Sequence, residues 1–323
     1  MKSPKFLKAV AIATLAAGLS LSHAAANAQA LRLGTATEGG VWFVLGNGLA
    51  QAVGEALDTR VMPVTTAGSM ENGRRLSAGG DLDLGLMLST SLKNGIEDGT
   101  IDTDKIRVIG AGHGNFLQVV VRGDSGISSW SEAFQPGRIV GVGEPGSAAF
   151  EVTTGAIEAQ GQSLDRIQQA RLGHQAQADA LKNRDIEVMV VTPGIPTGAV
   201  VSVMSTIDAK LLSGTDAELD KLLEAQPFMA RGLIPANIYN NQPENAATVM
   251  LPSLMMATAQ ISDDEAYKAT KAIYESTAKL TAVHSNGSQW TKDNALASRK
   301  YLEALGVQYH SGAIRYFQEI GIW

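Results

Sequence analysis

Short apolar runs alternate with helix-length stretches between residue 31 and about residue 205. The clearest helical pattern is in residues 41–57, where Val41, Leu45, Leu49, Val53 and Leu57 recur at the spacing of one helix face. The same criteria predict further strands at 30–33, 61–65, 82–88, 106–111, 116–122, 138–142 and 186–191, and further helices at 69–77, 148–160, 177–183 and 197–206. Because this alternation runs through two cycles, we expect an α/β fold with two lobes, each built on a mostly parallel sheet.

The rest of the chain has fewer strand signals. Residues 207–230 are polar and helical in pattern, and the apolar run 248–256 contains Pro252, which fits a crossing strand or a strand–helix join. Two amphipathic helices, about 263–280 and 291–304, are expected to close the chain. No flexible linker separates the cycles, so we expect crossing strands to join a first lobe (31–117 plus about 246–323) to a second lobe (about 118–245).

The N-terminus has the order of a secretory signal peptide. Lys2, Lys5 and Lys8 precede a short apolar run from about residue 9 to 21, and small residues follow up to Ala30. This pattern predicts export to the periplasm with cleavage after Ala30. The alternative, a retained anchor helix, is disfavoured because the run is shorter than the roughly 20 residues of a membrane span.

Composition narrows the possible functions. Removing the three signal lysines leaves 23 basic against 32 acidic residues, a net charge of −9, so nothing favours nucleic acid. The chain has no cysteine, which excludes disulfides, thiol nucleophiles and Cys-ligated zinc. The histidines show no metal-ligand spacing, and we expect no metal and no cofactor.

Four segments combine the end of a strand, a glycine-rich turn and the start of a helix. Ligands of open α/β sheets bind outside the carboxyl ends of the strands, and helix starts favour anionic groups. Each turn alone could be an ordinary cap, but four together predict a ligand cleft. The four segments supply these candidate ligand-binding residues: Thr37, Gly39, Gly40, Val41 and Trp42; Ser69 and Asn72; Pro145, Gly146 and Ser147; Pro193 and Gly194.

We expect the amides of Gly39, Gly40 and Ser147, with the hydroxyls of Ser69 and Ser147, to hold a carboxylate. Asn72 is expected to support the Ser69 turn, Trp42 to cover the ligand, and the loop at Pro193 and Gly194 to close over it from the second lobe. Ser89 and His113 complete the candidate set, because each follows a predicted strand. A solvated histidine and a core tryptophan are the alternative interpretations of His113 and Trp42.

Two enzyme interpretations are disfavoured. Residues 141–146 fit the dinucleotide pattern G-x-G-x-x-G, but Asp165 lies in a polar stretch rather than at a strand end, and an exported protein meets no nicotinamide cofactor. His113 and His174 lack a serine and an acid at a recognisable spacing, so a hydrolase is also disfavoured.

An ordered set of motifs resembles the TAXI family of periplasmic solute-binding proteins, which serve TRAP transporters driven by ion gradients. The matching segments are 33–35, 39–42, 68–72, 121–127, 142–147, 179–181, 185–187, 193–196, 238–239 and 312–317. The resemblance implies a type II-like periplasmic binding fold, two lobes with a cleft between them, and a monomer that delivers a small organic anion to a TRAP permease.

The chain departs from the family's pattern at a few positions. It has Trp42 where tyrosine is common, and different residues at 88–90 and 113–115, which leaves room for a less polar or differently shaped acid. The sequence thus favours a binding protein rather than an enzyme, with an amino acid, keto acid or dicarboxylate as ligand. The alternatives are the binding subunit of an ATP-driven importer and a periplasmic sensor for a membrane kinase.

Overall fold

The computed structural model describes residues 30–323, without the side chains of residues 300, 301 and 304. The predicted signal peptide, except for Ala30, lies outside the described residues. Residues 31–323 form one compact unit.

The first of two sheets combines parallel and antiparallel strands. Its order is β10-β11-β3-β1-β2, and β4 also pairs with β11. The strands are β1 (Leu31–Gly34), β2 (Val61–Val64), β3 (Leu84–Leu88), β4 (Ile106–Phe116), β10 (Ala230–Ile234) and β11 (Ala246–Thr258). Strand β1 is parallel to β2 and β3, whereas β11 is antiparallel to β3, β4 and β10.

The second sheet has the order β7-β6-β8-β5-β9. Its strands are β5 (Gln118–Arg122), β6 (Ile139–Gly141), β7 (Gln168–Ala170), β8 (Val188–Val191) and β9 (Ala209–Leu212). Strand β6 is parallel to β7 and β8, and β5 is antiparallel to β8 and β9.

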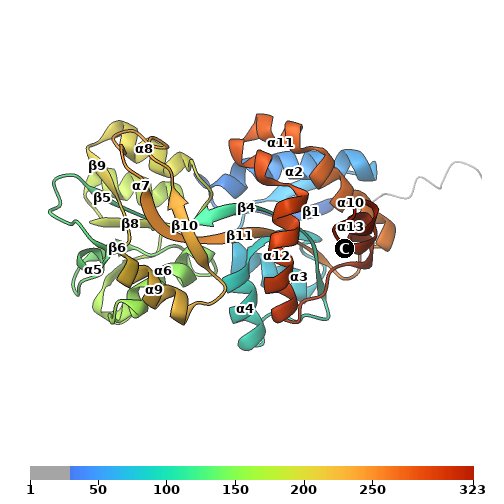
Figure 1. Cartoon of the computed structure of the whole chain (residues 1–323), viewed down its shortest axis with the longest axis horizontal. Coiled ribbons are helices and arrows are strands. Elements are labelled where there is room, and N and C mark those ends of the chain that lie inside the picture. The colour runs from blue at the N-terminus through green and yellow to red at the C-terminus, as the bar shows by residue number, and fades with distance from the viewer. Residues whose placement is uncertain (1–29) are drawn as a thin grey trace, which may run out of the picture. The chain divides into compact units, whose positions relative to one another are not determined.

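The helices divide into two groups, one around the parallel strands β1, β2 and β3 of the first sheet and one around the second sheet. The helices of the first lobe are α2 (Val41–Leu57), α3 (Ser69–Ala78), α4 (Ser89–Glu97), α10 (Asp263–Glu275), α11 (Thr277–Val283), α12 (Lys292–Ala304) and α13 (Ser311–Glu319). Those of the second lobe are α5 (Trp130–Ala133), α6 (Ala148–Ala159), α7 (His174–Asn183), α8 (Gly198–Thr206) and α9 (Asp216–Ala225). Short 3₁₀ helices lie at η1 (Leu164–Arg166) and η2 (Ser285–Gln289). The long strands β4 and β11 run from one lobe to the other (Figure 1).

The predicted helix face of residues 41–57 is confirmed as core. Val41, Leu45, Leu49 and Val53 are at most 1 % exposed, and helix α2 has the predicted bounds. The crossing strand predicted around Pro252 is also confirmed, because β11 contains this residue and bends there through an irregular register with β4.

Several expectations about the elements were wrong. The sheets are mixed rather than mostly parallel, because β5 and the crossing strand β11 run against their neighbours. Residues 207–230 contain β9 as well as α9, and β10 begins at Ala230. The structure also has three helices that the pattern analysis omitted: α4, the one-turn α5 and the terminal α13.

Candidate functional site

A pocket lies at the carboxyl ends of strands β1, β2, β3, β6 and β8, where turns from both lobes meet. Its lining residues are Ala36, Gly40, Val41, Trp42, Ala67, Gly68, Ser69, Leu88, Asn115, Ser147, Ala148, Ala149, His174, Thr192 and Pro193. The cavity volume is about 30 Å³, room for roughly two water molecules. Turns of the two lobes therefore meet around a small space.

Four helices begin at this pocket. Gly40 precedes α2, Gly68 precedes α3, Ser147 precedes α6, and His174 is the first residue of α7. The first N–H groups of a helix have no acceptor in their own helix, and the helix dipole places partial positive charge there. The pocket therefore has a positive potential supplied by the backbone.

The amides that face this space differ from those expected. The amide of Gly40 donates to the carbonyl of Thr37 at 3.4 Å, and that of Ser147 donates to Glu144 at 3.0 Å, so both are used within their own turns. The next N–H groups, those of Val41 and Trp42 in α2 and of Ala148 and Ala149 in α6, have no acceptor within their helix. The N–H groups without a partner in their own helix thus lie one or two residues further into the helices than expected.

The two serine hydroxyls expected at the ligand also have partners in the chain. Ser147 Oγ accepts from the amide of Phe150 at 3.1 Å and donates to the carbonyl of Glu144 at 2.7 Å, which makes it the N-cap of α6. Ser69 Oγ accepts from the amide of Leu88 at 2.8 Å, which leaves its own proton available. Of the two hydroxyls, Ser69 is the better donor to a ligand.

Backbone hydrogen bonds cross from lobe to lobe around the pocket. The amide of Glu71 in α3 donates to the carbonyl of Gly146 at 3.0 Å, and the amide of Gln175 in α7 donates to Glu38 at 3.3 Å. The amide of Ala199 in α8 donates to Gly39 at 3.2 Å. In each case a helix start in one lobe takes a loop carbonyl of the other, so closure satisfies groups that the helices leave unpaired.

The base of the pocket is a buried polar network on the crossing strands. The indole Nε1 of Trp42 donates to Ser253 Oγ at 2.9 Å, and Asn115 Nδ2 donates to the same oxygen at 2.8 Å. His113 Nε2 lies 3.2 Å from Ser253 Oγ, and Trp290 Nε1 donates to His113 Nδ1 at 3.2 Å. His113 is fully buried and does not line the pocket; it fixes Ser253, which in turn holds Trp42 and Asn115.

The pair of Ser253 and His113 has the spacing of a nucleophile and its base, but the wrong protonation. An indole N–H can only donate, so Nδ1 of His113 is the acceptor, and the neutral ring carries its proton on Nε2, toward Ser253. Burial lowers the pKa of His113 to about 3, which keeps the ring neutral. A ring that presents N–H to the serine cannot remove its proton, so this pair does not support hydrolysis.

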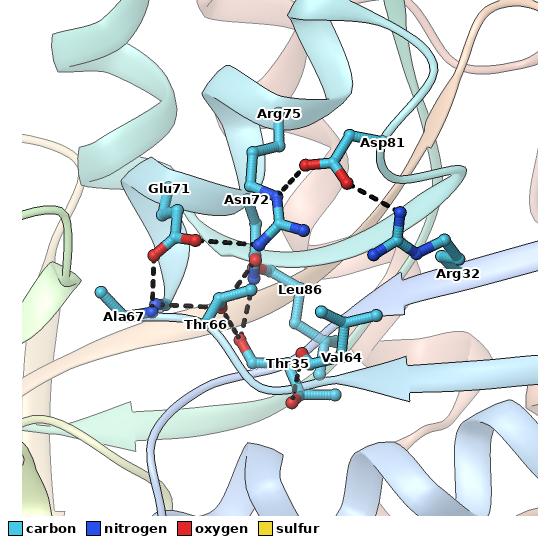
Figure 2. Close-up of polar contacts among 11 residues, drawn as sticks. Arg32, Thr35, Val64, Thr66, Ala67, Glu71, Asn72, Arg75, Asp81 and Leu86 are labelled. Carbon is cyan, nitrogen blue, oxygen red and sulfur yellow. Dashed lines mark hydrogen bonds and ion pairs between the residues drawn. The ribbon is translucent and has the colours of Figure 1, made fainter.

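Asn72 does not line the pocket. It lies in a network of hydrogen bonds with the strands beneath it (Figure 2). Its Nδ2 donates to the carbonyls of Thr35 and Leu86, both at 2.8 Å, and its Oδ1 accepts from Thr66 Oγ1 at 2.8 Å. This buried amide therefore ties together the ends of β1, β2 and β3. The expected supporting role fits these contacts, whereas direct ligand contact does not.

The structure brings together part of the predicted set. The predicted residues that line the pocket are Gly40, Val41, Trp42, Ser69, Ser147 and Pro193, and those that do not are Thr37, Gly39, Asn72, Ser89, His113, Pro145, Gly146 and Gly194. Ser89 donates to the carbonyl of Phe228 at 3.1 Å, and Gly194 packs against His113. Thr37 and Gly39 contact α7 and α8, so they lie where the lobes meet.

Among the lining residues that the sequence analysis did not name as ligand-binding candidates, His174 and Asn115 were each missed through a misplaced boundary. The helix start was set at residue 177, although α7 begins at His174 directly after Gly173. Strand β4 continues to Phe116 through Gly112 and Gly114, so Asn115 is a strand residue that faces the cleft rather than a loop residue. The turn glycine before residue 174 was the signal for the first, since it marks the N-cap of α7.

Thr192 is the most informative side chain in the pocket. It follows β8, is 5 % exposed, and its hydroxyl has no hydrogen-bond partner. An unpaired buried hydroxyl costs about 1–3 kcal/mol. The other two such hydroxyls in the described part of the chain, on Thr90 and Thr153, do not line the pocket.

Charged side chains are kept out of this space. Among the described residues, no Asp, Glu, Lys or Arg lines the pocket. Its one titratable side chain is His174, whose Nδ1 lies 3.5 Å from Thr37 Oγ1 and whose pKa is lowered to about 4 by burial. At neutral pH, therefore, no side chain that lines the pocket is charged.

Comparison with known protein families finds a match over most of the chain. The model of the NMT1-like family matches residues 33–321. This chain belongs to the NMT1-like family.

Several solved structures resemble this chain in fold at low sequence identity. A protein described as a periplasmic transporter is 12 % identical, with a TM-score of 0.56, over 93 % of this chain and 100 % of its own. The periplasmic binding protein BugD is 13 % identical, with a TM-score of 0.56, over 91 % and 97 %. The binding component of an ABC phosphonate transporter from Pseudomonas aeruginosa is 12 % identical, with a TM-score of 0.51, over 86 % and 86 %. The fold is thus the two-lobed fold of periplasmic binding proteins.

Two further findings cover the described residues. Within residues 30–323, no group of three or more His, Asp or Glu side chains is placed to hold a metal ion. In the same range, no helix combines the length and the apolar character needed to cross a membrane.

Proposed function

We propose that this chain is an exported solute-binding protein that closes on a small organic acid and delivers it to a membrane transporter. One observation carries the proposal: four helix starts from two lobes surround a pocket that no charged side chain lines. Backbone donors and helix dipoles of this kind bind anions. Contacts from both lobes couple ligand binding to closure.

The neighbours in fold and the N-terminal pattern support the transport role. Periplasmic binding proteins, including a component of an ABC phosphonate transporter, share the fold. The basic and apolar order of residues 1–30 is typical of export. We keep the lobe limits at about 117 and 246 as part of the proposal, since β4 ends at Phe116 and β11 begins at Ala246.

The finer proposal is a TRAP permease as partner and a carboxylate as ligand, as the TAXI resemblance implies. An ATP-driven importer is the second candidate, favoured by the fold shared with the phosphonate-binding component. Transport into vesicles that contain the purified permease distinguishes the two. Uptake that needs an ion gradient and no ATP supports the TRAP partner, and uptake that needs ATP overturns it.

The binding function itself is tested by thermal unfolding of the purified protein against a broad solute library, after unfolding and refolding to remove any carried ligand. A ligand at 100 times its Kd adds roughly 2.7 kcal/mol of stability, which shifts the Tm by several degrees. A shift with one solute class, together with a smaller radius of gyration by X-ray scattering, is the expected result. No binding to any solute by a folded protein would overturn the proposal.

A further inference from the structure

The loop between β8 and α8 forms part of the pocket wall through Pro193. Its backbone carbonyls are held by groups that do not line the pocket. The carbonyl of Pro193 accepts from Gln118 Nε2 at 3.3 Å and from the amide of Phe116 at 3.0 Å. The carbonyl of Gly194 accepts from Thr197 Oγ1 at 2.5 Å. Whatever fixes these donors therefore fixes this part of the wall.

Gln118 is the centre of this set of hydrogen bonds. The residue lies in β5 and is fully buried. Besides Pro193, its Nε2 donates to Thr197 Oγ1 at 3.1 Å, and its Oε1 accepts from the phenol of Tyr239 at 2.5 Å. Both N–H groups and the oxygen of the side-chain amide thus have partners. Removing a donor here would leave buried acceptors of the loop unpaired, which is costly.

Tyr239 decides which end of this amide faces the loop. The backbone N–H of Thr197 can only donate, and it donates to the phenol oxygen at 3.0 Å. The phenol keeps its own proton for Gln118, so Oε1 lies toward Tyr239 and the NH₂ group lies toward Pro193. Burial raises the pKa of Tyr239 to about 12, so the phenol is protonated at neutral pH.

The same loop is also held from the first lobe. Asn286 of η2 is fully buried, and its Nδ2 donates to the carbonyl of Ile195 at 2.9 Å. Three consecutive carbonyls, from Pro193 to Ile195, thus accept from three buried side chains on separate segments. Most loops lie on the surface and are mobile, whereas these bonds hold this loop in one position.

We infer that Gln118, oriented by Tyr239, is a positioning residue of the binding site, which holds Pro193 where a bound solute meets the second lobe. The inference rests on the proposed binding function and extends it to residues outside the pocket. Phe116, which donates to the same carbonyl, is the last residue of the crossing strand β4. This part of the wall is thus tied to the connection between the lobes.

The substitution Gln118→Glu tests this role, because the new side chain has nearly the same shape but donates only when it is protonated. As a carboxylate it has no proton to donate and repels the carbonyl of Pro193. As a carboxylic acid it has one O–H, which can again donate to that carbonyl. Burial raises the pKa of a carboxyl, to about 8–9 in documented cases, so measurements at pH 5 and pH 9 sample the two states.

The probe is the solute that shifts the Tm most in the broad library, and calorimetry measures its affinity at both pH values. Relative to the native protein at the same pH, Gln118→Glu should bind about tenfold more weakly at pH 9 and within about twofold at pH 5. This ratio removes the titration of the probe itself. Without solute, amide exchange of residues 194–198 should be faster than in the native protein at pH 9 and equal to it at pH 5.

A matched control makes the same change away from the pocket. Gln169 lies in the edge strand β7, and its amide donates to the carbonyl of Leu164 at 3.1 Å. Gln169→Glu should leave affinity unchanged at both pH values. A second variant, Tyr239→Phe, removes the group that orients Gln118 and should weaken binding about tenfold without recovery at pH 5.

Three results would overturn the positioning role and leave the binding function standing. They are unchanged affinity in folded Gln118→Glu at pH 9, an equal loss at both pH values, and an equal loss in Gln169→Glu. If Gln118→Glu does not fold, unchanged affinity in Tyr239→Phe has the same meaning. A folded native protein that binds no solute overturns the binding function itself.

Discussion

Two pockets lie against the crossing strands β4 and β11, and they differ in size and in chemistry. Alternate residues of a strand point to opposite faces, so Asn115 and Ser253 belong to the cleft side while Gly114, Met250 and Pro252 line the opposite side. The opposite pocket has a volume of about 260 Å³, against about 30 Å³ in the cleft.

The larger pocket has fewer free hydrogen-bonding groups for a ligand. Its polar neighbours are bonded to one another or to the backbone: Gln289 Nε2 donates to Asn286 at 3.0 Å, and Asn294 Nδ2 donates to the carbonyl of Gln289 at 2.6 Å. The smaller pocket is lined by residues from four helix starts and by Thr192, whose buried hydroxyl has no partner. Unpaired polar groups, rather than empty volume, therefore identify the candidate site.

The largest effect is expected from a substitution in the buried polar network on the cleft side of the crossing strands. It tests how much of the protein's stability depends on that network. His113→Ala leaves the indole N–H of Trp290 without its acceptor and opens a cavity, so it should lower the free energy of unfolding by about 3 kcal/mol. Urea unfolding measures the loss. Met250→Ala on the opposite side removes a half-buried chain beside an existing void and should cost clearly less; an equal loss would remove the contrast between the two sides.

The second prediction fills each pocket with the same two methyl groups. Ala148→Val places them in the cleft, where about 30 Å³ is available, and should weaken ligand binding at least tenfold, about 1.4 kcal/mol. Ala230→Val places them in the pocket of about 260 Å³ and should leave affinity unchanged, with equal or higher stability. Titration of both variants with the tightest ligand checks this. If Ala230→Val reduced affinity more than Ala148→Val, the ligand site would have to be assigned to the larger pocket on the opposite side of the crossing strands.

The smallest effect concerns Glu151, which lies in the first turn of α6 behind the cleft wall and accepts a hydrogen bond from Ser91 of α4, in the other lobe. Burial raises the pKa of Glu151 to about 7, although this hydrogen bond opposes the shift. The folded protein thus retains a proton that the unfolded chain releases from about pH 4.5 upward, so stability is greatest below that pH and falls as the pH rises through 7.

We expect a loss of about 1 kcal/mol between pH 5 and 8, after discounting the shift for the partial exposure of this side chain. Glu151→Gln keeps a hydrogen-bonding group but does not titrate, so this part of the pH dependence should disappear. Urea unfolding at several pH values measures both proteins. If the variant keeps the same dependence of stability on pH as the native protein, that dependence arises from another titratable group.

The sequence predicts the elements of the cleft better than its side chains. All four predicted strand–turn–helix segments are present, because strong apolar periodicity and turn glycines act locally. The pairing of β4 with β11 depends on residues more than 130 positions apart, and no local pattern reveals it. For the same reason His113, which follows no strand end but lies within β4, was misplaced in the site.

The burial of Thr192 without a partner could not be predicted from the sequence either. Threonine is ordinary after a strand, and only its burial without a partner makes it informative. His174 shows the opposite case, in which a local signal existed. Gly173 marks the start of α7, and a boundary set three residues earlier would have placed the histidine at a helix start.

The three backbone hydrogen bonds that cross between the lobes around the pocket have a consequence for how such a protein can change over time. Donors and acceptors are all main-chain atoms, and two of the acceptors belong to Gly39 and Gly146, whose φ angles of 83° and 88° favour glycine. Substitutions in the side chains of the surrounding turns can change which solute the pocket binds, while these backbone hydrogen bonds between the lobes persist. Descendants of this sequence could therefore exchange one solute for another at little cost, provided that these two glycines are retained.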